Sequence, residues 1–393
     1  MPADDQLRNR IRTLQTTLEE WARRHELWAG CRFQSYHSFY EDEPNWEKPC
    51  LTVLSAGDRM IQILKGAYSR ITDELDELME VRDYYYVNEG EALLFYTHDE
   101  TFQYALADYC RWQWLCDVIR PDYTDLYQEL YQHFHQRPEF FQRLYWRDFE
   151  VFVSELLKRK GYQVMLGPGR GDGGVDITFL DPKALVPSVT LVQVKQQKAP
   201  IELHAVSALL GALEDQDQKK GLFVTSSRFR PGAAAFAGRQ TRRMIQLADA
   251  RDLAGWSFDA AAEVGNSIKK YTSRDYILDV FGAVFPDLTG RILVTTVAEG
   301  FKDTFFPEFV VILRDTKHLC LVMQLPTQRY HDSSFSEATE IPVKSLDLYD
   351  VEPLHKIVFR VRKQFDSNGA LTFHGRRNIY DLWDNTPASS LRD

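Results

Sequence analysis

Two polar side chains share one face of an otherwise apolar strand pattern near the middle of the chain. Residues 190–196 read TLVQVKQ. Because side chains alternate between the two faces of a strand, Gln193 and Lys195 lie on one face and the neighbouring valines on the other. A second strand-like segment, GVDITFL at 174–180, carries Asp176. This polar set needs either structural partners or a chemical role.

The residue types favour a metal-assisted reaction. Neighbouring strands lie about 4.8 Å apart, so Asp176 can lie beside Gln193 and Lys195 if the two strands pair. Carboxylate and amide oxygens suit Mg²⁺, with Mn²⁺ as a substitute. A lysine beside them can stabilise charge on a phosphoryl group or orient a water. The set predicts phosphodiester hydrolysis with Asp176 and Gln193 as metal ligands. The alternative is an internal ion pair between Lys195 and Asp176, with Gln193 as a hydrogen-bonded core residue.

A helix pattern at 139–160 supplies a further candidate. Its predicted buried stripe consists of Phe149, Phe152, Val153, Leu156 and Leu157. At about 100° per residue, Glu150 falls on the edge of this stripe and Glu155 on the far, polar side. Glu150 is therefore predicted to point inward, either paired with an arginine or delivered to the polar site.

The glycine-rich loop GPGRGDGG at 167–174 formally matches the GxGxxG motif of dinucleotide-binding proteins. That motif binds pyrophosphate only where a helix follows it, and here a strand-like segment follows. The glycines are predicted to form a tight turn instead. Asp172 either caps this turn or adds an acid, and Arg170 and Lys198 are candidate DNA contacts.

The elements that position these residues predict an α/β core. From 139 to 257 the order is helix, three strands, helix, strand, with a further helix and strand after it, which predicts a mixed sheet flanked by helices. The composition changes on both sides of this segment. We therefore predict an α+β N-terminal domain at 1–138, the core at 139–257 and a β-rich C-terminal domain at 258–393.

Charge is unevenly distributed along the chain, whose formal net charge is -10. Residues 1–145 hold 15 Lys+Arg against 26 Asp+Glu, and 257–393 hold 16 against 19. Only residues 146–256, with 16 against 12, carry a net positive charge, which favours contact with phosphate groups. The acidic N-terminal domain is predicted to bind a basic protein partner or to restrain the site.

The remaining composition points to a cytoplasmic protein. The five cysteines contain no CxxC pair, which argues against a structural zinc site and for a reducing compartment. No apolar run approaches the ~20 residues of a membrane span. The N-terminus is polar, so no signal peptide and no membrane contact are expected.

Taken in series, the motifs at 147–255 resemble the Mrr-type restriction endonuclease domain of the PD-(D/E)xK nuclease superfamily. The matching positions are Phe149-Glu150, the run DGGVD ending at Asp176, Gln193-Val194-Lys195 and Thr225-Ser226. The resemblance implies a restriction-endonuclease-like core with Asp176 as a metal ligand. Gln193 marks the QxK variant, in which glutamine replaces the usual acid. The flanking domains resemble no family that we can name.

The resemblance implies a Mg²⁺-dependent DNA endonuclease that restricts foreign or modified DNA in anti-phage defence. Asp176 and Lys195 would be indispensable, with Gln193 and Glu150 in support. Two alternatives stay open: a nuclease for RNA, branched or single-stranded DNA, and a nuclease-fold module that binds DNA without cleaving it. A homo-oligomer is compatible with cutting both strands.

Overall fold

The computed structural model describes residues 2–40, 48–65, 70–120, 124–169, 173–185, 188–298, 305–332, 337–366, 369–375 and 378–391. Two of the predicted site residues, Arg170 and Asp172, lie outside these ranges. The chain forms two compact units. One is Leu115–Ser273, and the other combines Met1–Trp114 with Arg274–Asp393.

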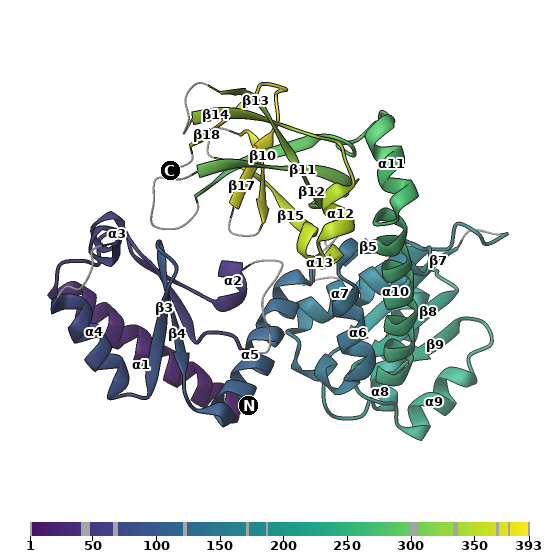
Figure 1. Cartoon of the computed structure of the whole chain (residues 1–393). Helices are drawn as coiled ribbons and strands as arrows, with labels where there is room; N and C mark the ends of the chain where they lie inside the picture. The colour runs from purple at the N-terminus through teal and green to yellow at the C-terminus, as the bar shows by residue number, and fades with distance from the viewer. Residues whose placement is uncertain are drawn as a thin grey trace. The chain divides into compact units, whose positions relative to one another are not determined.

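The unit Leu115–Ser273 is built on a five-stranded sheet in the order β5-β6-β7-β8-β9 (Figure 1). The strands are β5 (Gln163–Leu166), β6 (Ile177–Leu180), β7 (Val189–Lys195), β8 (Lys220–Thr225) and β9 (Met244–Ala248). The first three pair antiparallel, and β7, β8 and β9 pair parallel. The sheet is therefore mixed, and its elements follow the predicted order.

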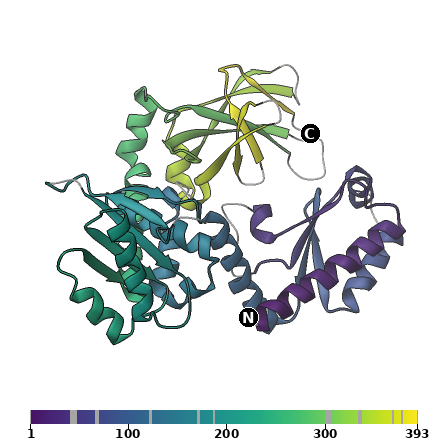
Figure 2. The same cartoon turned by 180° about the vertical axis from the view of Figure 1, so that it is seen from behind.

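Helices cover both faces of this sheet. They are α6 (Gln128–Gln136), α7 (Trp146–Arg159), α8 (Leu203–Asp215), α9 (Pro231–Gly238) and α10 (Ala250–Tyr271), with the 3₁₀ turns η1 (Thr124–Leu126) and η2 (Pro138–Arg143). Leu191, Phe223 and Ile245, from three neighbouring strands, pack with apolar residues of α8 and α9. Figure 2 shows the sheet and its helices from behind. α7 packs against β5, β6 and β7.

The unit extends beyond the predicted core segment 139–257 at both ends. α6 precedes that segment and packs closely on α10, which continues past it to Tyr271. At the crossing, a Cβ on Gly265 would lie 2.4 Å from the side-chain amide nitrogen of Gln128, so the two helices approach each other closely there. Because α6 and α10 pack together, the compact unit runs from Leu115 to Ser273, which the pattern of predicted strands does not indicate.

The N-terminal part of the chain has a four-stranded antiparallel sheet in the order β1-β2-β4-β3. The strands are β1 (Arg32–Gln34), β2 (Thr52–Ser55), β3 (Tyr84–Asn88) and β4 (Ala92–Thr97). The helices are α1 (Pro2–Arg24), α2 (Tyr36–Tyr40), α3 (Asp58–Lys65), α4 (Arg70–Glu80) and α5 (Glu100–Val118). A core of its own includes Trp21, Leu54 and Phe95, as an α+β domain requires.

The C-terminal part is a nine-stranded sheet that closes on itself. A second pairing between β10 and β11 joins the ends of the series β10-β17-β16-β15-β12-β11, which makes a six-stranded barrel. Its strands are β10 (Ile292–Ala298), β11 (Phe305–Asp315), β12 (Leu319–Leu325), β13 (Thr327–Asp332), β14 (Glu337–Pro342), β15 (Val358–Phe365), β16 (Leu371–Gly375), β17 (Asn378–Leu382) and β18 (Ala388–Leu391). The helices are α11 (Arg274–Gly282), α12 (Asp347–Val351) and α13 (Leu354–Ile357). Throughout the described chain, no helix is both long enough and apolar enough to cross a membrane.

Candidate active site

Asp176 directly precedes β6 and lies at the carboxyl end of β7. Its N–H donates to the carbonyl of Val192 at 2.9 Å, just beyond the last pair of the antiparallel register, Ile177 opposite Val192. The carboxylate oxygen Oδ2 accepts a hydrogen bond from the N–H of Val194 at 2.6 Å. The predicted pairing of the two strands is confirmed, and a backbone donor fixes the orientation of the carboxylate.

The side-chain oxygen of Gln193 is buried and has no hydrogen-bond partner within the described part of the chain. Gly174 closes over this amide: its φ of +84° favours glycine, and a Cβ there would lie 3.7 Å from Gln193 Nε2. A buried acceptor of this kind is costly unless something satisfies it. Gln193 is therefore not the hydrogen-bonded core residue of the alternative interpretation.

The chemistry of this donor set fits a hard divalent cation. Asp176 offers carboxylate oxygens and Gln193 offers an unpartnered amide oxygen, the ligand types that Mg²⁺ prefers. The described residues contain no cluster of three histidine, cysteine, aspartate or glutamate side chains suited to a metal. Among the described residues, a site here would therefore draw on Asp176 and Gln193.

Lys195 is exposed at the last position of β7. Within the described ranges its ammonium has neither an ion-pair nor a hydrogen-bond partner. The internal Lys195–Asp176 ion pair of the alternative interpretation is therefore absent. The amine remains available for an external anion.

The backbone beyond Lys195 is held by a frame of side-chain hydrogen bonds. Thr225 Oγ1 donates to the carbonyl of Lys195 at 3.0 Å, and Ser226 Oγ accepts from the N–H of Gln197 at 2.9 Å. Gln196 Nε2 donates to the carbonyl of Gln142 at 2.8 Å. Of these residues, only Thr225 and Ser226 could be picked out from the sequence, through the resemblance. Gln142 and Gln196 could not be found from it because their contact spans many residues.

Glu150 points inward, as predicted, and is 5% exposed. Arg147 pairs with it: Nη1 lies 2.7 Å from Glu150 Oε2, and Nη2 donates to the carbonyl of Gly167 at 2.7 Å. The N–H of Gly167 in turn donates to the carbonyl of Asp176 at 2.7 Å. The structure thus links Glu150 to Asp176 through an arginine and the glycine-rich loop, and Arg147 is a site residue that the sequence interpretation missed.

The predicted exposure of Glu155 is wrong, since this residue is only 3% exposed. All residues from Phe149 to Leu157 are buried, because α7 packs against the sheet and also against α10. Lys158 satisfies the buried carboxylate, with Nζ at 2.8 Å from Glu155 Oε1. A helix covered on several sides does not follow a one-stripe pattern.

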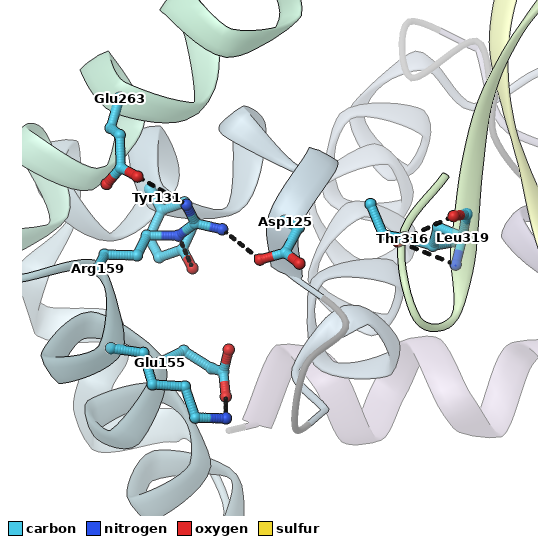
Figure 3. Close-up of polar contacts among 8 residues, drawn as sticks. Asp125, Tyr131, Glu155, Arg159, Glu263, Thr316 and Leu319 are labelled. Atoms are coloured by element: carbon cyan, nitrogen blue, oxygen red, sulfur yellow. Dashed lines mark hydrogen bonds and ion pairs between the residues drawn. The ribbon is translucent and has the colours of Figure 1, made fainter. Parts of the chain in front are cut away.

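Arg159, at the end of α7, joins this helix to its neighbours (Figure 3). It donates to Tyr131 Oη at 2.9 Å and to Asp125 Oδ1 at 2.8 Å, and it pairs with Glu263 at 3.5 Å. Burial alone would lower the pKa of Arg159, but these three partners raise it above its ordinary value. The network fixes the helix that carries Glu150.

The glycine-rich loop is followed by strand β6, so the prediction that it is not a dinucleotide-binding loop is consistent with the structure. Lys198 lies on the surface three residues beyond β7. Arg170 and Asp172 lie outside the described residues, so their predicted roles stay predictions.

Comparison with known proteins adds an identity for this segment. Residues 141–257 match the family Mrr_cat, described as restriction endonuclease. The type IV methyl-directed restriction enzyme EcoKMrr of Escherichia coli (strain K12) is 36% identical over 95 residues, which is 23% of this chain and 31% of that enzyme. The predicted resemblance to an Mrr-type restriction endonuclease domain is confirmed. The match spans less than a third of the relative's length.

Solved structures of restriction endonucleases show limited similarity to this chain. The MspJI restriction endonuclease in complex with a 27-mer oligonucleotide is 20% identical, covers 37% of this chain and 35% of its own, and gives a TM-score of 0.23. The DNA modification-dependent restriction endonuclease AspBHI is 14% identical, covers 56% and 64%, and gives 0.26. With TM-scores this low, the fold assignment rests on the family match and on the strand order.

Proposed function

We propose that this chain is a Mg²⁺-dependent DNA endonuclease that restricts foreign or modified DNA in the cytoplasm as part of anti-phage defence. The restriction endonuclease domain at 141–257 supports a nuclease, and the name of the methyl-directed relative supports restriction. The observation that carries the proposal is the buried side-chain oxygen of Gln193, which has no partner among the described residues. It lies on the strand whose Val194 N–H holds the Asp176 carboxylate and whose Lys195 is likewise unpaired among those residues.

Each residue has a distinct role in this proposal. Mg²⁺, or Mn²⁺ in its place, held by Asp176 and Gln193 would polarise a phosphoryl oxygen and lower the pKa of a bound water. The N–H of Val194 keeps the Asp176 carboxylate oriented. Lys195 stabilises negative charge on the attacked phosphate, because no carboxylate among the described residues neutralises its ammonium. Glu150 supports the site through Arg147.

The domains flanking the nuclease segment are proposed to select the target, to regulate cleavage or to bind a protein partner. The acidic charge of residues 1–145 suits restraint, because it repels duplex DNA. A homo-oligomer would bring two sites to opposite strands.

The test is cleavage of methylated and unmethylated plasmid DNA in Mg²⁺, in Mn²⁺ and in chelator. Lys195→Ala should lower the cleavage rate at least 100-fold, as loss of a principal charge-stabilising group does. Lys220→Ala removes the same side chain from the opposite end of the neighbouring strand and should cleave as wild type does. Equal cleavage by wild type and Lys195→Ala would refute the proposal.

A further inference from the structure

Two chain segments run side by side beyond the carboxyl ends of β7 and β8. The N–H of Ile201 donates to the carbonyl of Arg228 at 2.8 Å, and the N–H of Arg230 donates to the carbonyl of Ile201 at 3.0 Å. Ser227 Oγ donates to the carbonyl of Ala199 at 2.7 Å. The segments 196–201 and 226–230 therefore form one fixed surface next to Lys195.

This surface presents cations that no protein carboxylate neutralises. Lys198 and Arg228 are exposed, one on each segment, and within the described ranges neither has an ion-pair or hydrogen-bond partner for its charged group. Lys195 has the same property. Three unpaired cations on adjoining backbone segments give a local positive potential that attracts phosphate.

Apart from Asp176 of the candidate site, two acidic residues near these segments are already paired with arginines. Glu202 pairs with Arg230 at 3.2 Å, and Asp249 pairs with Arg251 at 3.1 Å while it caps α10. They therefore subtract little from the field of the unpaired cations.

We infer that Lys198 and Arg228 form a track for the sugar-phosphate backbone of duplex DNA, which leads one strand to Lys195. This inference rests on the proposed function, and it names the surface through which the substrate binds. Contacts to phosphates carry no sequence information, so the track sets affinity and position on the duplex and leaves target choice to other residues.

Two arginines that follow α9 offer a matched control. α9 carries the chain from the carboxyl end of β8 back to the amino end of β9, because these two strands are parallel. Arg239 and Arg242 follow α9 and are exposed, so they lie at the edge of the sheet opposite Lys198 and Arg228. Their removal changes the net charge equally without touching the track.

The experiment measures binding of the full chain to a fluorescein-labelled duplex of mixed sequence by anisotropy, in chelator, over a series of salt concentrations. Lys198→Ala/Arg228→Ala should reduce the slope of log affinity against log salt by roughly 2, about 0.9 for each lost phosphate contact. Arg239→Ala/Arg242→Ala should keep the wild-type slope. Melting temperatures of both variants verify folding.

The outcomes separate the two proposals. If wild type binds but the Lys198/Arg228 variant keeps its slope, or if both double variants lose the same amount, the track is refuted and the nuclease proposal stands. If wild type binds no duplex at all, both are refuted.

Discussion

At the scale of one residue, the buried side-chain oxygen of Gln193 links the observed structure to the proposed metal chemistry, because it has no hydrogen-bond partner among the described residues. A buried acceptor without a donor costs roughly 1–3 kcal/mol relative to the hydrated group. Either a bound cation or an apolar replacement of the same size would remove this cost. The cation would bind through the Gln193 oxygen, whereas an apolar side chain would abolish that binding. Substitution of Gln193 therefore tests the metal site directly.

We expect Mg²⁺ to raise the melting temperature of wild type and to have no effect on Gln193→Leu. In chelator, Gln193→Leu should be at least as stable as wild type, because the unsatisfied oxygen is gone. Calorimetry in Mg²⁺ and in chelator measures both effects. Gln246→Leu, an exposed glutamine on β9 of the same sheet, should respond to Mg²⁺ as wild type does. An equal rise in melting temperature for wild type and Gln193→Leu would contradict a metal ligand at this position.

Glu150 shows how one position can satisfy two interpretations. Helical spacing predicts that it points inward, and it does, but its ion pair with Arg147 also matches the plainer expectation of a paired carboxylate. Arg147 bonds the carbonyl of Gly167 as well, so the pair holds the loop before Asp176. The catalytic role of Glu150 therefore stays a proposal, whereas the contacts of Arg147 with Glu150 and with Gly167 are observed.

At the scale of elements, α7 depends on the Arg159 network for its place against α6 and α10. The side chain of Arg159 is only 13% exposed, and its loss removes the donor to the hydroxyl of the buried Tyr131. We expect Arg159→Met to lower the free energy of unfolding by about 3 kcal/mol, at the lower end for a broken buried network because Asp125 and Glu263 are half exposed. Urea unfolding measures this change.

Arg251→Met is the control for that measurement, since its side chain is 91% exposed. Its partner Asp249 keeps the backbone donors of Arg251 and Asp252 when the guanidinium is removed. The midpoint of Arg251→Met should stay close to that of wild type. A similar loss of stability in both variants would mean that the contribution of Arg159 to the free energy of unfolding does not depend on its burial.

The elements could be predicted from the sequence where local periodicity determines them. Alternation along β7 placed Gln193 and Lys195 on one face, and the strand order predicted a mixed sheet. What could not be predicted depends on contacts between distant segments. Glu155 is buried because α10 covers α7, and Gln142 reaches the carbonyl of Ser226 from another element. Periodicity within one helix contains no information about either contact.

At the scale of the whole molecule, the compact unit starting at Leu115 changes how the acidic N-terminal region must be tested. Removing residues 1–138 also removes α6, the partner of α10. A changed activity after that deletion would report damage to the nuclease unit as readily as loss of restraint. Deletion of residues 1–114 is the cut that tests regulation.

We expect a chain of residues 115–273 to unfold in one cooperative transition and a chain of 139–273 to lack one. The side chains lost from the shorter chain include several that are at most 1% exposed, among them Leu126, Tyr127, Leu130, Tyr131 and Phe134. At roughly 2 kcal/mol for each buried side chain, their loss approaches the 5–15 kcal/mol by which a domain is stable. Circular dichroism during urea unfolding distinguishes the two chains. Equal, cooperative transitions in both would show that the nuclease core ends at residue 139 and that α6 belongs to the preceding domain.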